Sequence, residues 1–227
     1  MTESIKGSSR CSEPMRHLIL LGDSIFDNER YTSGGPPVVR QVRSLLPAGW
    51  QASLRAIDGS VAGDVPRQAG RIPADATHLV LSAGGNDALQ KVGVIDAEVS
   101  SAGEALALLA NIADSFGRDY RQAVEACLRC NLPLAVCTIY NGRFDPVFQR
   151  LVSVALMVFN DVIIRTAVEK DLPVIDLRSI CALAEDYANP IEPSSIGGEK
   201  IARAIVGLVT ESHAGGARLL GCPMNRA

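Results

Sequence analysis

The sequence predicts an α/β protein in which a five-stranded parallel sheet is covered by helices on both faces. Apolar segments of strand length alternate along the chain with longer segments whose apolar residues recur at helical spacing. The strand segments are continuous apolar runs, which is typical of parallel strands buried on both faces. Because a parallel pair needs a crossover, the alternation of the two kinds of segment implies right-handed connections that lie on both sides of the sheet.

The first half of the chain contains three of the five expected strands. Residues 17–21 form the first, and the loop after it ends at Gly34-Gly35-Pro36-Pro37, where proline is tolerated in the first turn of a helix over 38–46. Residues 51–57 alternate enough to be a second strand. A glycine-containing turn over 58–64 leads into a short helix, and residues 78–83 form the third strand.

The second half continues the alternation. An Ala- and Leu-rich helical segment covers 96–130, with Gly103 and Gly117 expected to interrupt it. The remaining expected elements are a strand over 132–139, a helix with a wide apolar face over 147–170, a strand over 172–177 and an amphipathic helix over 198–210. The whole chain, 1–227, is expected to be one domain with loosely ordered tails over 1–15 and 212–227.

Composition excludes several classes of partner. The net charge of −3 argues against binding to nucleic acid or to an anionic membrane surface. Residues 1–14 lack the apolar core of a signal peptide, and we expect no apolar stretch to be long and unbroken enough to span a bilayer. We therefore expect a cytoplasmic protein without nucleic-acid or membrane partners, and the oligomeric state stays open.

Cysteines and histidines do not suggest a metal or cofactor. Cys127 and Cys130 have the two-residue gap of a zinc or redox pair, but no second pair or histidine cluster accompanies them. Reduced, structural thiols are the favoured interpretation. The three histidines, His17, His78 and His213, are scattered in the sequence.

Three residues with complementary chemistry follow successive predicted strands. Ser24 follows the first strand, Gly63 the second and Asn86 the third. Because parallel strands end at one edge of the sheet, these residues can converge there. A serine nucleophile beside a backbone N–H and an amide that can stabilise an oxyanion is the equipment of acyl transfer.

The same three blocks resemble motifs of the SGNH (GDSL) hydrolases. The matching segments are Gly22-Asp23-Ser24-Ile25, Asp58–Asp64 with Gly63, and Gly84-Gly85-Asn86-Asp87, within a resemblance that runs from about Arg16 to Val209. The resemblance implies a three-layer α/β/α flavodoxin-like sandwich and hydrolysis of a small carboxylic ester. It also implies that Ser24 is the nucleophile and that its own N–H, Gly63 and Asn86 form the oxyanion hole.

The fourth block departs from the family. Where the family has Asp-x-x-His-Pro, this chain has Asn189-Pro190-Ile191-Glu192-Pro193, so the usual base and its orienting aspartate are replaced. Glu192 is the candidate base, with the Asn189 amide expected to donate to it. A free glutamate is a weaker base than histidine, although burial would strengthen it, so activity is expected to begin at a lower pH than in a histidine enzyme.

Two alternatives accompany this hypothesis. The chain can instead be a non-catalytic domain that binds an acyl or carboxylate ligand in the same pocket, or His213 can fold back as the base. His17 and His78 begin strands whose far ends carry Ser24 and Asn86, which places them roughly 20 Å from the site. The expected substrate-binding residues are Asp23, which also braces the turn at Ser24, and the residues Tyr140, Asn141 and Phe144 after the fourth strand.

Overall fold

The centre of the fold is a single parallel sheet. The computed structural model describes residues 15–211 and 219–220, and its strands are ordered β2-β1-β3-β4-β5-β6. The strands are β1 (Arg16–Gly22), β2 (Trp50–Leu54), β3 (His78–Ser82), β4 (Leu134–Cys137), β5 (Val174–Ile175) and β6 (Leu219–Leu220). The first five confirm the predicted parallel sheet, and their order is that of a flavodoxin-like doubly wound fold.

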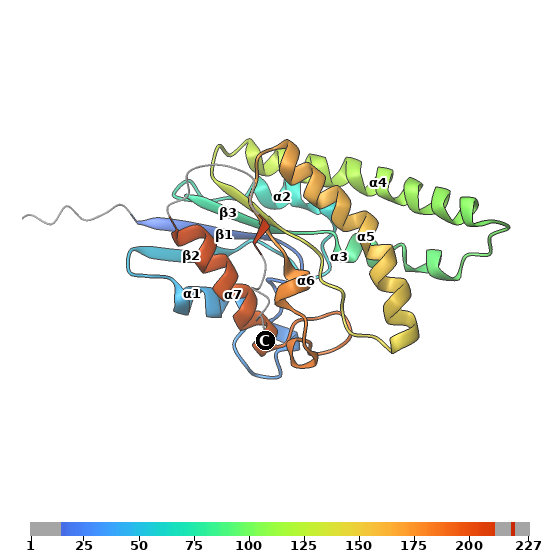
Figure 1. Cartoon of the computed structure of the whole chain (residues 1–227). Helices are drawn as coiled ribbons and strands as arrows, with labels where there is room; N and C mark the ends of the chain where they lie inside the picture. The colour runs from blue at the N-terminus through green and yellow to red at the C-terminus, as the bar shows by residue number, and fades with distance from the viewer. Residues whose placement is uncertain (1–14, 212–218, 221–227) are drawn as a thin grey trace, which may run out of the picture.

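Helices cover both faces of this sheet (Figure 1). One face carries α1 (Val38–Leu45), α6 (Leu177–Ile180) and α7 (Ser195–Thr210), and the other carries α2 (Val65–Ala69), α4 (Ala102–Leu128) and α5 (Pro146–Glu169). The short helix α3 (Gly85–Leu89) and the 3-10 turns lie in the connections. These turns are η1 (Glu29–Tyr31), η2 (Ala62–Asp64), η3 (Val92–Asp96) and η4 (Ala184–Asp186).

Strand β1 shows why the strands are continuous apolar runs. Ile19 and Leu21 pack into the core beneath α2, α4 and α5, whereas Leu18 and Leu20 pack into the core beneath α1 and α7. Successive side chains of a strand point to opposite faces, so a strand between two helical layers needs apolar residues at every position. All four side chains are fully buried, and each contributes about 1.5–3 kcal/mol of hydrophobic free energy.

Helix α4 lies within the predicted segment 96–130 and is more regular than the sequence predicted. It runs unbroken for 27 residues, with Gly103 in its first turn and Gly117 buried in its interior, so the expected interruptions are wrong. Tertiary packing explains the difference at Gly117. The helix there is fixed by buried neighbours such as Phe116 and Tyr120, and this outweighs the low helix propensity of glycine.

Helix α5 differs from the expectation that no apolar stretch is long enough to span a bilayer. Among the described residues it is the one helix long and apolar enough to cross a bilayer, judged by length and composition alone. The same pattern is typical of a core helix. Seven of its residues are buried against the rest of the protein, including the polar Asn160 and Thr166.

The chain ends differ from the prediction at one point. Leu219–Leu220 form β6, which pairs with β5 through Val174 and Ile175 and adds a sixth strand to the sheet. The other parts of the two expected tails, residues 1–14, 212–218 and 221–227, lie outside the described residues.

Candidate active site

Ser24 is held at the carboxyl edge of the sheet by a tight turn after β1. Gly22 ends the strand with φ +122°, and a Cβ on it would lie 1.7 Å from the carbonyl oxygen of Ser82. Only glycine fits this close approach between β1 and β3. The next residue continues the turn, because the Asp23 N–H donates to Ser82 O (3.1 Å) and the Asp23 carboxylate accepts from the Ile25 N–H (3.2 Å).

A buried glutamine fixes the same turn from the side of α2. The Gln68 amide accepts from the Gly22 N–H and donates to the Gly22 carbonyl, both at 2.8 Å, and also reaches the Ser60 hydroxyl (3.2 Å). Gln68 is 2% exposed. Sequence reasoning missed it, because the glutamine lies 46 positions from Gly22 and no local motif marks it.

Ser24 and Glu192 form a direct buried pair. The Ser24 hydroxyl donates to Glu192 Oε1 at 3.1 Å, and the two residues are 7% and 6% exposed. Burial raises the pKa of Glu192 to about 7, the hydrogen bond from Ser24 opposes that shift, and the charge of Asp58 adds to it. The second carboxylate oxygen, Oε2, is buried without a hydrogen-bond partner.

Asn189 does not make the expected contact with the Glu192 carboxylate. Its side-chain oxygen accepts from the backbone N–H groups of Ile191 and Glu192, both at 2.9 Å, and the residue is exposed. Asn189 therefore shapes the turn that carries Glu192, as asparagine commonly does in turns. The Tyr140 hydroxyl fastens this turn to the loop after β4 by donating to the Ile191 carbonyl at 2.6 Å.

The predicted oxyanion-hole residues lie on two loops that are bonded together. The Asn86 amide donates to the Ser60 carbonyl (2.9 Å), and the Ala62 N–H donates to the Asp87 carboxylate (2.9 Å). These bonds join η2 to α3. Asn86 lines the same pocket as Ser24 and Glu192, whereas Gly63 is exposed, does not line that pocket, and has no atom within 4 Å of the place where a Cβ would stand.

An apolar pocket opens beside the serine. Its cavity volume is about 130 Å³, and its lining includes Asp23, Tyr140, Asn141 and Phe144, so all four predicted substrate-binding residues reach it. The wall away from the sheet is built from η3, α4 and α5, and includes Val92, Ile95, Leu109, Ile112, Phe148 and Val152. Such a wall suits an aliphatic or aromatic group rather than a charged one.

Asp23 is a second buried carboxyl group in this pocket. Burial raises its pKa to about 8; the Ile25 N–H opposes the shift, and the charges of Glu192 and Asp87 reinforce it. Asp23 is therefore largely protonated at pH 7, so the pocket does not hold two full carboxylate charges together. Its bond to Ile25 gives it the bracing contact that the sequence predicted.

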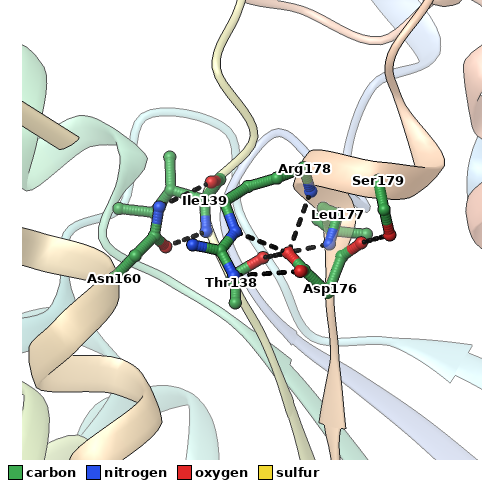
Figure 2. A network of polar contacts seen from close by, with 7 residues as sticks. All are labelled: Thr138, Ile139, Asn160, Asp176, Leu177, Arg178 and Ser179. Carbon is green, nitrogen blue, oxygen red and sulfur yellow. Dashed lines mark hydrogen bonds and ion pairs between the residues drawn. The ribbon is translucent and has the colours of Figure 1, made fainter. Parts of the chain in front are cut away.

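A polar network holds the ends of β4 and β5 together (Figure 2). Asp176 accepts from the Thr138 hydroxyl (2.9 Å) and from two guanidinium nitrogens of Arg178 (2.7 and 2.9 Å). On the other side of Thr138, the Asn160 amide bonds both the N–H (2.8 Å) and the carbonyl (2.9 Å) of Ile139. Since Ile139 precedes Tyr140 and Asn141, this network positions the loop that lines the pocket.

None of the cysteines that the structure describes lines this pocket. Cys127, Cys130, Cys137 and Cys181 are free thiols, and within residues 15–211 and 219–220 no cluster of three or more His, Cys, Asp or Glu side chains could hold a metal. Burial raises the pKa of Cys127 and Cys181 to about 12, which keeps both thiols protonated and unreactive near neutral pH.

The fold and this site together define an α/β protein of the SGNH hydrolase type. The chain belongs to the GDSL-like lipase/acylhydrolase family, whose sequence model matches residues 20–197. Among curated proteins, none matches the sequence significantly.

Solved structures of esterases and lipases share the fold. An extracellular lipase from Streptomyces rimosus is 16% identical with a TM-score of 0.61, and the match covers 87% of this chain and 100% of the lipase. A lipolytic G-D-S-L protein from Veillonella parvula is 16% identical with a TM-score of 0.64, covering 86% and 99%. An acetylxylan esterase from Geobacillus stearothermophilus is 18% identical with a TM-score of 0.58, covering 86% and 94%.

Proposed function

We propose that the protein is a serine ester hydrolase that cleaves a small carboxylic ester with Glu192 as its base. The observation that carries the proposal is the 3.1 Å hydrogen bond from the Ser24 hydroxyl to Glu192 Oε1. A nucleophile within hydrogen-bond reach of a group with a pKa of about 7 satisfies both the geometric and the protonation requirement for general base catalysis near neutral pH.

The proposed reaction proceeds through an acyl-enzyme. Ser24 Oγ attacks the ester carbonyl carbon while its proton passes to Glu192, and the resulting oxyanion accepts hydrogen bonds from the Ser24 N–H and the Asn86 amide, whose residues both line the pocket. Glu192 then returns the proton to the departing alcohol. Water, deprotonated by Glu192, attacks the acyl-enzyme, and the carboxylic acid leaves as Ser24 recovers its proton.

The pocket supports an apolar acyl group in this reaction. Phe148, Val152 and Leu156 line it from successive turns of α5 and Phe159 from the next, so the wall spans about 16 Å along the helix. Each methylene group buried there adds about 0.8 kcal/mol. Lengthening the acyl chain of a p-nitrophenyl ester should therefore raise kcat/KM by about threefold to fourfold per methylene until the pocket is filled.

The proposal is tested by active-site labelling. A fluorophosphonate should attach covalently to Ser24 in the wild-type protein, as located by peptide mass spectrometry, and Ser24→Ala should lose both labelling and ester hydrolysis. Ser44→Ala is a matched control that removes a hydroxyl from α1, whose bond is to the Gln41 carbonyl. A wild-type protein that neither labels nor hydrolyses any of a broad panel of esters would refute the proposal.

One observation favours a second candidate, a non-catalytic domain that binds an acyl or carboxylate ligand. The Glu192 carboxylate receives no orienting hydrogen bond from Asn189, and its Oε2 atom is buried without a hydrogen-bond partner. A base that lacks an orienting group is compatible with a pocket that binds but does not turn over. In that case a medium-chain carboxylic acid should raise the Tm equally in the wild-type protein and in Ser24→Ala, with no turnover in either.

A further inference from the structure

A second cavity lies at the β2 edge of the sheet and shares no lining residue with the pocket beside Ser24. Its volume is about 390 Å³, within the range of small-ligand sites. Three arginines, Arg55, Arg67 and Arg71, line it together with Gln68 and the apolar residues Leu54, Ala56 and Ile57. No acidic residue is part of the lining, although the protein as a whole carries a net charge of −3.

Arg55 is held in one orientation by backbone groups instead of a carboxylate. Its Nε donates to the Arg71 carbonyl and its Nη1 to the Leu54 carbonyl, both at 3.1 Å. These two bonds fix the plane of the guanidinium and leave its positive charge without a counter-charge. Among the ion pairs of residues 15–211, none involves Arg55 or Arg71.

Arg67 is the one arginine of the three with an acidic partner. It pairs with Asp64 at 3.1 Å, and the two side chains are 62% and 33% exposed. An ion pair this open to water contributes little to stability, so the guanidinium can turn to a more highly charged ligand. The cavity therefore presents three guanidinium groups against one weakly held carboxylate.

The backbone that carries Arg67 and Arg71 is held in place by hydrogen bonds before any ligand binds. Gln68 is 2% exposed, and its amide is fully engaged with Gly22 and Ser60. Arg67 and Gln68 are adjacent on α2, and Arg71 follows one turn later, so the bonds of Gln68 also anchor the segment that carries both arginines. A site whose cationic groups stand on a fixed backbone loses less entropy when a ligand binds.

We propose that this cavity binds the phosphate groups of a small polyanion, of about the size of a diphosphate. Guanidinium groups recognise phosphate oxygens through paired N–H donors, and the strength of such bonds comes from the charge on both partners. The cavity volume leaves room for more than one phosphate group. The inference does not depend on ester hydrolysis, because none of the three arginines lines the pocket beside Ser24.

Isothermal titration with inorganic pyrophosphate, in buffer without divalent cations, tests the proposal. Saturable 1:1 binding is expected, stronger than for inorganic phosphate, and the Tm should rise with pyrophosphate concentration but not with sodium chloride at equal ionic strength. Arg71→Gln and Arg55→Gln should each weaken binding by about tenfold or more. Arg203→Gln, which removes an exposed arginine paired with Glu199 on α7, should bind as the wild type does.

Three results would overturn the proposal. The first is the absence of pyrophosphate binding above the sodium chloride control. The second is unchanged affinity in the Arg55→Gln/Arg71→Gln double variant. The third is loss of binding in Ser24→Ala, which would place the anion in the ester site. Arg71→Gln keeps the backbone carbonyl that Arg55 uses, so it gives a decisive answer even if Arg55→Gln fails to fold. Circular dichroism of each variant establishes folding before titration.

Discussion

At the scale of single residues, burial changes the chemistry of Glu192. A free glutamate has a pKa near 4.3, about two units below that of histidine. In the protein that pKa rises to about 7, because the carboxylate is buried and faces the charge of Asp58. The activity of a Glu192 enzyme would therefore begin near the pH at which a histidine enzyme begins, and not below it as the sequence alone suggested.

Replacing Glu192 by glutamine tests its proposed role. The carboxamide oxygen still accepts a hydrogen bond from Ser24 but cannot take up the proton, so kcat should fall by about a hundredfold or more. In the wild type, kcat against pH should rise through about 7. Steady-state kinetics on a soluble ester between pH 5 and 9 measures both effects.

Temperature then separates a carboxylate base from an imidazole base. The ionisation of a carboxyl group changes little with temperature, whereas the pKa of imidazole falls on warming. The midpoint of the pH profile should therefore stay fixed between 15 and 35 °C. Glu185→Gln, a change to an exposed glutamate on η4, is the matched control. Full activity of Glu192→Gln, in an enzyme that still needs Ser24, would exclude Glu192 as the base.

The Asp23 carboxyl makes stability depend on pH in a definite direction. Its folded pKa of about 8 and that of Glu192, about 7, lie above their unfolded values near 4. An acid with a raised folded pKa stabilises the folded state fully below its unfolded pKa, and that stability is lost as pH rises through the folded pKa. The free energy of unfolding should therefore fall between pH 4 and pH 8.

Asp23→Asn should flatten that dependence. Asparagine keeps an oxygen that can accept from the Ile25 N–H and has no charge to desolvate, so the variant should be more stable than wild type at pH 8 and nearly equal at pH 4. Urea unfolding at both pH values measures the difference. Asp114→Asn changes an exposed aspartate on α4 and serves as the control. A variant that is less stable than wild type at pH 8 would show that the buried carboxylate has a stabilising partner.

At the scale of secondary-structure elements, side chains from α5 and from the segment after β5 fix the ends of β4 and β5. Asn160 should matter most, because it satisfies both backbone groups of Ile139 from inside the core. Asn160→Ala leaves a buried N–H and a buried carbonyl without partners, which costs about 2–6 kcal/mol in unfolding free energy. Denaturant unfolding measures that loss.

Enzyme kinetics on Asn160→Ala distinguish a role in positioning the pocket loop from a role in stability alone. If Asn160 positions the pocket loop, Asn160→Ala should also raise KM for esters with longer acyl chains at a temperature well below its Tm. Thr210→Ala removes a hydroxyl that bonds a carbonyl within α7, far from the loop, and should leave KM unchanged. An unchanged KM in Asn160→Ala would assign Asn160 a purely structural role.

The strands were predictable for a local reason, and the interruptions of α4 were not. A strand between two helical layers must be apolar throughout, so a run such as Leu18–Leu21 can be recognised as a buried strand from the sequence alone. Whether Gly117 breaks a helix depends on how α4 packs, and the Phe116 ring beside it packs on Phe159 of α5, which is distant in the sequence. The same applies to Asn189, whose side chain bonds the local backbone rather than the carboxylate three residues later.

At the scale of the whole molecule, topology decided how much of the site could be inferred. Ser24 and Asn86 follow adjacent parallel strands, so the strand order alone brings them to one edge. Glu192 lies 168 positions from Ser24 and was found through a resemblance in motif order. Gln68, Thr138 and Asp176 were missed, because each acts on backbone or side chains of a distant element and belongs to no local pattern.

The segment that contains the last strand, β6, also contains the alternative candidate for the catalytic base. β6 covers the outer edge of β5, and the stretch that leads to it contains His213, which lies outside the described residues. A chain shortened to end at Glu211 loses both. An uncovered strand edge exposes unpaired backbone groups, so the shortened chain should unfold about 1–2 kcal/mol more easily and associate more readily. Urea unfolding and light scattering measure these effects.

The kinetic outcome of the same change decides between Glu192 and His213. If Glu192 takes the proton from Ser24, the point variant His213→Ala should keep the wild-type kcat and pH profile, and the shortened chain should keep both at temperatures where it is folded. Comparing the two separates the histidine from the strand, because the point variant leaves β6 in place. A loss of about a hundredfold in His213→Ala, with normal unfolding in urea, would transfer the role of base to that histidine. Glu192 would then remain as the hydrogen-bond acceptor that orients Ser24.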